Sequence, residues 1–334
     1  MKPVGVVVIG RNEGERLKRC LGSLQGRGWP VIYVDSGSTD GSIALAQSMN
    51  CETLPLDAAR PFSAARARNE GISWMSRRRP DLEYLQLLDG DTELLDGWIE
   101  EGVRLLDDRA EACAVVGRLN EIHPEQSVYN RICDLEWKLP AGEVQIFGGI
   151  ALLRVKAFVE SGGFNETLIA GEEPELSQRL RRSGWKIVSL ERDMALHDAG
   201  ITRFGQWWKR ALRSGHAYAQ VCSMGSGLWN RFGLRQCLRT WFWVALLPLG
   251  ACLSTLLHPA CPLAGAGIFL LQLIRIAVGI RRRGASAGTS AAYALLWLPS
   301  QAAQALGQLK FLWTRLLRRR SVLIEYKNAP DENG

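Results

Sequence analysis

The chain has 334 residues, of which 47% are hydrophobic and 22% charged. This composition excludes a largely disordered protein and predicts one or two folded domains. The net charge of +7 conceals a division, because residues 1–200 carry 24 Lys and Arg against 31 Asp and Glu, whereas residues 201–334 carry 17 against 3. The basic residues of the second part bracket long apolar runs, which favours an anionic membrane surface over nucleic acid as the partner.

Residues 1–200 alternate short β-branched runs with segments of helical periodicity. This alternation predicts an α/β fold in which a mostly parallel sheet has helices on both faces. The first strand is too short for the core of a signal peptide, so we expect this part of the chain in the cytoplasm. The expected strands are 4–9, 31–35, 51–55, 84–89, 114–119, 151–154 and 185–190, and the expected helices are 13–24, 40–49, 64–77 and 96–106.

Polar residues follow or close three of these strands, at the edge where such sheets bind ligands. They are Arg11, Asp35 and Asp89. Asp91 adds a second carboxylate one residue after Gly90, and Mg²⁺ or Mn²⁺ prefers such oxygen ligands together with diphosphate oxygens and water. The alternative is a turn in which Asp only tolerates the backbone conformation.

A small-residue turn at 35–42 joins the second strand to the next helix. Asp35 could accept hydrogen bonds from a base or ribose there, whereas Thr39 or Asp40 could simply cap the helix. The sequence contains neither a Gly-x-Gly-x-x-Gly after the first strand nor a Gly-x-x-x-x-Gly-Lys-Ser/Thr, so the dinucleotide fingerprint and the P-loop are both excluded. Phosphates would need another holder, and a metal at Asp91 would supply one.

The order of six segments resembles that of the family 2 glycosyltransferases. The segments are Val-Val-Ile-Gly-Arg-Asn-Glu at 7–13, Val-Asp-Ser-Gly-Ser-Thr-Asp-Gly-Ser at 34–42, Ala-Arg-Asn-Glu-Gly at 67–71, Leu-Asp-Gly-Asp at 88–91, Phe-Gly-Gly at 147–149 and Gly-Glu-Glu-Pro-Glu-Leu at 171–176. The resemblance covers residues 4 to about 200. It implies the Rossmann-like GT-A fold of nucleotide-diphospho-sugar transferases and transfer with inversion from a nucleotide-activated sugar.

The resemblance also implies roles for residues around the nucleotide. Asp35 is similar to the aspartate of the family that binds the base or ribose, and Arg68 to its nucleotide-contacting arginine. Glu13 matches a position that lines the nucleotide pocket. Asp89 would contribute to the ribose or the metal. Arg66, two residues before Arg68, competes for the arginine role, and a solvated helix face is the structural alternative for both.

A second set of implied roles concerns the metal and the base. Asp91 resembles the metal-binding carboxylate, and His197 lies where many relatives have a histidine that completes the metal or diphosphate site. Glu173 matches the catalytic base, with Glu172 as the alternative, because relatives usually have Asp in the second position. Alternatively, His197 is a structural histidine and the two acids merely offset a helix dipole.

Two departures from the family pattern bear on the reaction. Asp-Ser-Gly-Ser at 35–38 replaces the commoner Asp-Asp-Gly-Ser, which removes a neighbouring acid. Gln-Arg-Leu-Arg-Arg at 178–182 looks superficially like the Gln-x-x-Arg-Trp of processive synthases, but it lies on the helix just after Glu173. We interpret it as a solvated helix face, which favours transfer of a single sugar over polymerisation.

After residue 200 the composition changes to aromatic, basic and apolar residues. We expect amphipathic interfacial helices at 201–239, membrane-associated helices at 240–320 and a tail at 321–334. The apolar runs 240–257 and 260–280 have spanning length. The run 290–313 carries Gln301, Gln304 and Gln308 at helical spacing and is interrupted by Pro299. Because basic clusters follow both the second and third runs, we predict two spans and a third segment that lies in the interface or re-enters the membrane.

Together these features predict a metal-dependent glycosyltransferase anchored in the plasma or inner membrane, with its catalytic domain in the cytoplasm. It would move a sugar from a UDP-, GDP- or dTDP-sugar to a lipid or lipid-linked acceptor, using Mn²⁺ or Mg²⁺. One alternative is a catalytically inactive, membrane-anchored protein that only binds nucleotide-sugars. A sugar nucleotidyltransferase is disfavoured because its Gly-rich signature does not follow the first strand.

Overall fold

The structure is a computed structural model that describes residues 2–224 and 231–319. The expected tail at 321–334 therefore lies outside the described residues. Contacts within the chain divide it into two units, each described here by itself. Unit 1 is Met1–Ile122 with Glu136–Ala199, and unit 2 is His123–Leu135 with Gly200–Gly334.

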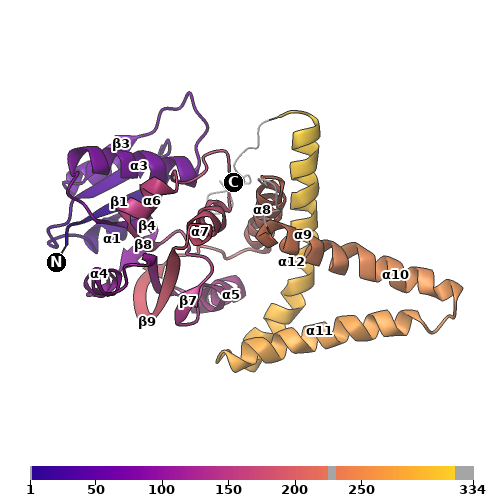
Figure 1. The fold of residues 1–334 in the computed structure, drawn as a ribbon. Coiled ribbons are helices and arrows are strands. Elements are labelled where there is room, and N and C mark those ends of the chain that lie inside the picture. The colour runs from indigo at the N-terminus through magenta and orange to yellow at the C-terminus, as the bar shows by residue number, and fades with distance from the viewer. Residues whose placement is uncertain (1, 225–230, 320–334) are drawn as a thin grey trace. The chain divides into compact units, whose positions relative to one another are not determined.

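Unit 1 is built on one mixed sheet with mostly parallel strands (Figure 1). In spatial order, the main path of the sheet is β3-β2-β1-β4-β8-β6-β9-β5, and β7 pairs with β9. β8 runs antiparallel to both β4 and β6. The strands are β1 Val4–Gly10, β2 Val31–Asp35, β3 Glu52–Pro55, β4 Tyr84–Asp89, β5 Thr92–Leu94, β6 Ala112–Glu121, β7 Gly142–Val144, β8 Ala151–Arg154 and β9 Lys186–His197.

Helices cover both faces of this sheet, which confirms the expected α/β fold. One core lies under α3, α6 and α7 and the other under α1, α2 and α4 (Figure 1). Strand β1 serves both cores, because Val7 and Ile9 point into the first and Val6 and Val8 into the second. These helices are α1 Glu15–Gly22, α2 Ser42–Ser48, α3 Ala64–Arg78, α4 Trp98–Asp108, α6 Val155–Glu160 and α7 Glu172–Arg182.

Several elements of unit 1 have no counterpart among the predicted ones. Strands β5 and β7 have only three residues each, too few for a periodic pattern, and β9 runs seven residues beyond the expected end at 190. That extension pairs with β5 and β6 and ends at His197. Helix α5, Val128–Trp137, was also not predicted; its first eight residues belong to unit 2 and its last two to unit 1.

The register of the parallel strands brings three of the predicted polar positions to one edge of the sheet. Asp35 pairs with Gly10 on one side of β1, and Asp89 pairs with Ile9 on the other. Two strand spacings of about 4.8 Å therefore separate the strands of Asp35 and Asp89 at this edge, roughly 10 Å in all. Arg11 follows the end of β1 between them.

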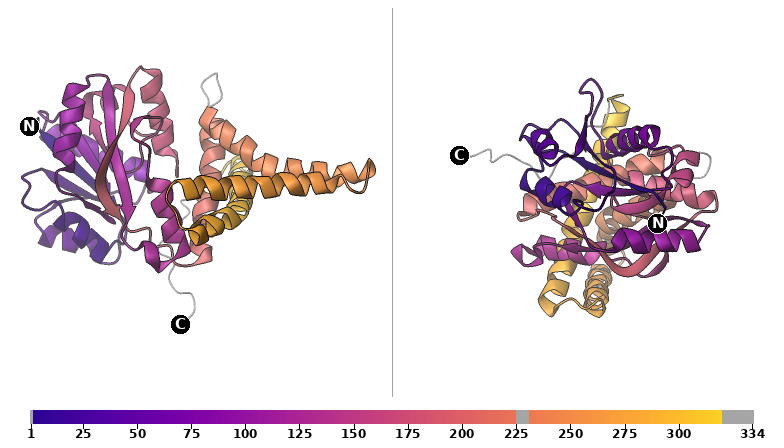
Figure 2. Two further views of the ribbon diagram at one scale, coloured as in Figure 1. Left: turned by 90° about the horizontal axis from the view of Figure 1, so that it is seen from below. Right: turned by 90° about the vertical axis from the view of Figure 1, so that its left-hand side faces the viewer.

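Unit 2 is helical in the described residues. Two of its helical segments are long and apolar enough to cross a membrane, Phe232–Leu256 and Pro262–Arg282. Figure 2 shows α10 and α11 side by side as the arms of a hairpin. The helices after residue 200 are α8 Phe204–Ser223, α9 Arg231–Trp241, α10 Leu247–Leu253, α11 Pro262–Arg282 and α12 Ala287–Leu316, with a π-helical segment at Phe242–Leu246 between α9 and α10.

Within unit 2, α12 packs closely against α8. A Cβ added to Gly215 of α8 or to Gly307 of α12 would overlap the backbone of the opposite helix, so only glycine permits this crossing. The glutamines Gln301, Gln304 and Gln308 of α12 are buried, and the hydroxyl of Thr240 in α9 donates to Gln304 Oε1 at 3.3 Å. The prediction that Pro299 interrupts the third apolar run is wrong, because α12 continues through this residue.

Candidate active site

Arg68 is the centre of a buried charge cluster at the carboxyl edge of the sheet. Its side chain is 3% exposed, and its Nη1 donates to Glu172 Oε1 at 3.0 Å and to Glu173 Oε1 at 3.1 Å. Its Nη2 donates to Asp89 Oδ1 at 3.0 Å. Burial alone would lower the pKa of Arg68, but Asp89, Glu173 and Glu172 raise it, so the guanidinium stays charged.

The helices that carry this cluster begin at well-defined points. Ser63 caps α3 by accepting a hydrogen bond from the Arg66 amide at 3.2 Å, and Arg68 lies in the second turn. Gly171 precedes α7 with a φ of 83°, so Glu172 and Glu173 are the first two residues of that helix. Their position would suit a helix dipole, but both side chains also reach Arg68.

The two acids of α7 differ in their access to solvent. The side chain of Glu172 is 5% exposed and that of Glu173 is 18% exposed, so Glu173 has more room to meet a substrate. Burial and the adjacent charge of Glu172 raise the pKa of Glu173 to about 7, against the opposing effect of Arg68. One arginine thus faces three carboxylates. Of these, Glu173 holds a proton more easily than an ordinary glutamate does.

Gly149 lies directly against this cluster. A Cβ at this position would come within 2.6 Å of Arg68 Nη2, 3.1 Å of Asp89 Oδ2 and 3.3 Å of Glu173 Oε1. A Cβ at Gly148 would meet no atom within 4 Å. The loop is held to α7, because the amide of Phe147 donates to Ser177 Oγ at 3.2 Å. The sequence drew attention to the Phe-Gly-Gly segment but not to this close approach.

Asp89, Asp91 and His197 form a group that could hold a metal ion. One ligand atom from each lies within 4.8 Å of the others. Asp91 is 4% exposed, and His197 Nε2 is 3.1 Å from Asp91 Oδ1. Two carboxylates and an imidazole are donors that suit Mn²⁺ or Mg²⁺ with oxygen ligands in the remaining positions. Asp89 therefore belongs both to this group and to the Arg68 cluster.

Trp137 adds an aromatic face to the same group. Its indole is stacked on the His197 ring, with 4.4 Å between the centroids and 24° between the planes. Trp137 is the last residue of α5, and 60 positions separate it from His197 in the sequence. Nothing in the local sequence around Trp137 distinguishes it from a surface or core tryptophan, so no signal there could have identified it.

Asp35 is buried at the end of β2 and organises the turn that follows. Its carboxylate accepts hydrogen bonds from the Tyr33 hydroxyl at 2.9 Å, from the Gly37 amide at 2.9 Å and from the Ser38 amide at 2.8 Å. At Gly37 the φ is 81°, and a Cβ would come within 2.8 Å of the Phe62 ring. The turn thus needs glycine at position 37. Asp35 itself is only 1% exposed, and it shapes the turn by accepting these hydrogen bonds.

Arg11 and Glu13 lie in the loop after β1. The Arg11 guanidinium is 5.6 Å from the centroid of the Phe62 ring, which is a cation–π distance. Glu13 forms an ion pair with Arg16 at 3.0 Å, and its side chain packs beside Gly90 of the Asp-Gly-Asp segment. Asn12 ties this loop to the next one, since its side-chain oxygen accepts from the Thr39 amide at 2.7 Å.

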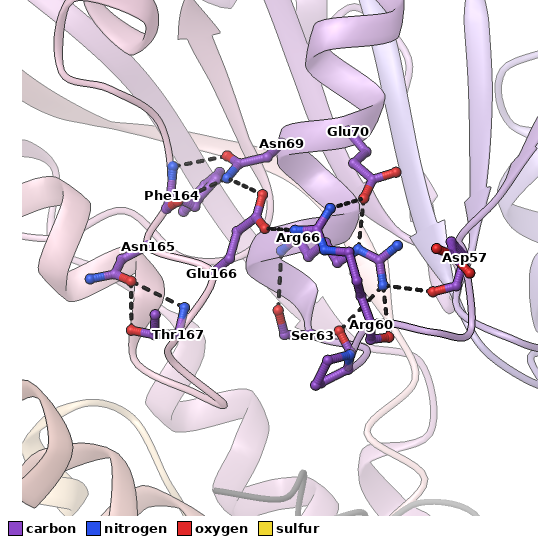
Figure 3. Close-up of polar contacts among 11 residues, drawn as sticks. Asp57, Arg60, Ser63, Arg66, Asn69, Glu70, Phe164, Asn165, Glu166 and Thr167 are labelled. Atoms are coloured by element: carbon purple, nitrogen blue, oxygen red, sulfur yellow. Dashed lines mark hydrogen bonds and ion pairs between the residues drawn. The ribbon is translucent and has the colours of Figure 1, made fainter. Parts of the chain in front are cut away.

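Arg66 has a role different from that of Arg68. It is 2% exposed, and its Nη1 donates to the carbonyl oxygens of Asp57 and Arg60 at 2.9 Å each (Figure 3). Its Nε donates to Glu70 at 2.6 Å. Arg66 thus fixes the loop before α3, and its burial excludes a solvated helix face for this residue.

Asn69 fixes a second loop on α3 (Figure 3). Its Nδ2 donates to the Phe164 carbonyl at 2.8 Å, and its Oδ1 accepts from the Phe164 amide at 2.9 Å. The Phe164 ring in turn lies 5.6 Å from the Arg68 guanidinium. Arg60 pairs with Glu166 of the same loop at 2.6 Å. This loop leads into α7, so Asn69 anchors the approach to Glu172 and Glu173.

The expected solvated face at 178–182 is only partly found. Arg181 and Arg182 are exposed, but Leu180 is buried in the core. Arg179 is 31% exposed, pairs with Glu175 at 2.7 Å and donates to the Gly163 carbonyl at 2.6 Å. Arg179 therefore holds the 161–163 loop against α7. The sequence instead predicted a solvated helix face at this position.

Comparison with known proteins shows which family the first part of the chain resembles. Residues 5–158 match the family described as Glycosyl transferase family 2. The chain is 26% identical over 262 residues to the glycosyltransferase AglE of Haloferax volcanii, spanning 73% of this chain and 81% of that protein. It is 26% identical over 215 residues to the pre-mycofactocin glycosyltransferase of Mycobacterium tuberculosis, spanning 59% of this chain but only 43% of that protein.

A solved structure shares the fold. The mannosyltransferase PcManGT from Pyrobaculum calidifontis, described in complex with GDP-Man and Mn²⁺, aligns with a TM-score of 0.57 and 17% identity over 93% of this chain and 87% of that one. Its likeness bears on the fold, while the family match and the curated relatives bear on the class of enzyme. Residues 5–158 are therefore similar to the family 2 glycosyltransferases, and the chain has the GT-A fold.

Proposed function

We propose that this protein is a membrane-anchored, inverting and metal-dependent glycosyltransferase. It moves a sugar from a nucleotide-sugar donor to a lipid or lipid-linked acceptor at the cytosolic face of the membrane. The observation that carries the proposal is the continuity of the site. Asp89 is shared between the candidate metal group with Asp91 and His197 and the Arg68 cluster that holds Glu173.

The proposed reaction is a single displacement at the anomeric carbon. Glu173 removes the proton from the acceptor hydroxyl as its oxygen attacks that carbon, and the bond to the phosphate oxygen breaks with its electron pair leaving on the nucleoside diphosphate. Attack from the face opposite the leaving group inverts the configuration, so no enzyme nucleophile is needed. The greater exposure of Glu173 supports it over Glu172 as the base.

Arg68 has a positioning role in this proposal. Its guanidinium is already occupied by three carboxylates, so it orients Glu173 and Asp89 instead of relying on the nucleotide for partners. Its positive charge also offsets part of the negative charge that the acids bring together. The role implied by the family resemblance, direct contact with the nucleotide, stays a prediction, and Arg68 Nε has no hydrogen-bond partner in the described part of the chain.

The metal would be Mn²⁺ or Mg²⁺ held by Asp91 and Asp89, with His197 completing the set. The donor set fits such an ion, and the group is adjacent to the strand end where a diphosphate would lie. When bound, the ion supplies charge stabilisation for the departing diphosphate. The presence of GDP-Man and Mn²⁺ in the Pyrobaculum mannosyltransferase structure is consistent with this assignment.

The nucleoside would lie along the edge from Asp35 to Asp89. The roughly 10 Å between the two strand ends is comparable to the length of a ribose with its first phosphates. Arg11, Glu13 and the Asp35 turn form the loops at this edge. The donor is a UDP-, GDP- or dTDP-sugar, and a screen of all three identifies which.

The membrane anchor would be the helical hairpin of unit 2. Only 6% and 11% of the apolar windows in its two segments are buried inside the structure, unlike the core helices of a soluble domain. Leu256, Leu257 and Leu271 are among the exposed apolar side chains. The basic residues 281–283 after the second segment would face the cytosol under the positive-inside tendency, together with unit 1. Helix α12 would then lie in the interface.

The test is transfer from labelled UDP-, GDP- and dTDP-sugars to membrane lipid extract, using the full chain in vesicles with and without Mn²⁺ or Mg²⁺. We expect nucleotide release and labelled lipid with one donor, an inverted linkage, and loss of both signals in Asp91→Ala and Glu173→Gln. Donor binding without any turnover would favour the nucleotide-sugar binding protein instead. If no donor binds, the proposed function is wrong.

A further inference from the structure

The end of β9 holds the main chain of His197 tightly. The residue pairs with Thr92 of β5 on one side and with Glu121 of β6 on the other, and its carbonyl accepts from the Ile122 amide at 3.1 Å. The backbone at this position therefore has little freedom. What remains adjustable is the plane of the imidazole ring, which decides where the Nε2 lone pair points.

Two of the contacts described for His197 restrict that ring plane. One is the 3.1 Å approach of Nε2 to Asp91 Oδ1, and the other is the stack on Trp137. The first contact joins two candidate ligands to each other. When both turn their donor atoms to an ion, this contact is exchanged for contacts to the metal, whereas the Trp137 stack uses the ring face and is compatible with a bound ion.

We propose that Trp137 is a positioning residue for the metal-binding imidazole of His197, so that it raises the affinity of the site for the divalent cation. The inference rests on the proposed function, since it requires that His197 ligates the ion. The indole covers one face of the ring, holds its plane for ligation and keeps water from that face. Trp137 is only partly buried, so its side chain is not fully accounted for by core packing.

The measurement is binding of Mn²⁺ alone to the full-length protein, followed by the loss of the electron paramagnetic resonance signal of free Mn²⁺. We expect Trp137→Ala to weaken Mn²⁺ binding about ten-fold and Trp137→Phe, which retains an aromatic face, to restore most of it. Trp74→Ala is the matched control, because this partly buried indole of α3 has a different partner, the Arg78 guanidinium at 4.4 Å. The control should bind Mn²⁺ as the wild type does.

A second measurement does not depend on the folding of the alanine variant. Paramagnetic Mn²⁺ quenches the fluorescence of a nearby indole, and Mg²⁺ does not. Because the chain has 12 tryptophans, the fluorescence of Trp137 is obtained as the difference between the wild type and Trp137→Phe. We expect Mn²⁺ to quench this difference signal, and Mg²⁺ to leave it unquenched. Equal quenching of both proteins would show that the indole is not beside the ion and would overturn the inference.

The outcomes separate this inference from the proposed function. A wild-type protein that takes up no Mn²⁺ contradicts the metal-dependent function, and the inference falls with it. A wild-type protein that binds Mn²⁺ with the same affinity as Trp137→Ala contradicts the inference and leaves the proposed function standing. Weakened binding in Trp137→Ala with recovery in Trp137→Phe supports both.

Discussion

Arg68 Nη1 lies 3.1 Å from Glu173 Oε1, a contact that joins α3 to the first turn of α7 across 105 positions of sequence. The same guanidinium holds Glu172 and Asp89, so the candidate base and a candidate metal ligand share one buried cation. A change at any member of this cluster is therefore expected to affect the others.

The pH dependence of transfer should report Glu173. Its pKa is raised to about 7, chiefly by burial and by the charge of Glu172. A base must be unprotonated to accept the acceptor proton, so kcat/KM should rise with pH through about 7 and fall at lower pH. Glu173→Gln should lower the rate by about 10²-fold or more and abolish this limb, whereas a profile flat from pH 5 to 8 in the wild type would argue against Glu173 as the base.

The raised pKa of Glu173 also predicts how stability depends on pH. Stability should fall as pH rises, whereas the transfer rate should increase. A carboxyl group whose pKa is higher in the folded than in the unfolded state stabilises the fold most when protonated. Its contribution is therefore present below the ordinary glutamate pKa and is lost as pH rises through about 7. Chemical denaturation of the wild type and Glu173→Gln at pH 5 and pH 8 should show the smaller dependence on pH in the variant.

Gly149→Ala should disable the site without unfolding the protein. The added Cβ would lie 2.6 Å from Arg68 Nη2 and 3.1 Å from Asp89 Oδ2, so both side chains must shift. A displacement of this size at a catalytic cluster costs about 10²-fold in rate. Gly148→Ala is the control, because its Cβ meets nothing within 4 Å. Equal kcat values for the two variants would contradict the close approach.

Asn69→Ala should loosen the loop that leads into α7. Both main-chain groups of Phe164 lose their partner, which costs about 1–3 kcal/mol of unfolding free energy for buried polar groups. Asn165→Ala is the control, since the Asn165 side chain accepts from the amide and the hydroxyl of Thr167 in the same loop, at 3.1 Å and 2.7 Å. Hydrogen exchange at the Phe164 amide should accelerate in Asn69→Ala alone, and unchanged exchange there would refute the anchor.

Leu271→Asp should weaken membrane association. Leu271 is 67% exposed in α11, and a charged residue at the centre of a spanning helix costs about 3 kcal/mol of insertion free energy. Val159→Asp is the control, because Val159 is 62% exposed on α6 of unit 1. The fraction resistant to alkaline extraction from membranes should fall for the first variant and not for the second. Equal resistance of both would count against the hairpin as the anchor.

Local patterns in the sequence determined much of unit 1. Strands β1, β2, β4 and β8 were predicted to within one residue, because each is a short β-branched or apolar run bounded by turn residues. The order of the six segments also indicated the glycosyltransferase family, and the apolar runs after residue 240 indicated helices of spanning length. These features are local, so periodicity and composition reveal them.

The partners within the site were decided by tertiary structure alone. The sequence contains Arg66 and Arg68 as equivalent neighbours, but 100° of helix rotation per residue sends Arg66 to the loop before α3 and Arg68 to the acids of α7. The stack of Trp137 on His197 and the approach of Gly149 to Arg68 likewise join segments far apart in the chain. A one-dimensional pattern records which side chains are present, whereas the packing of helices on the sheet decides which of them meet.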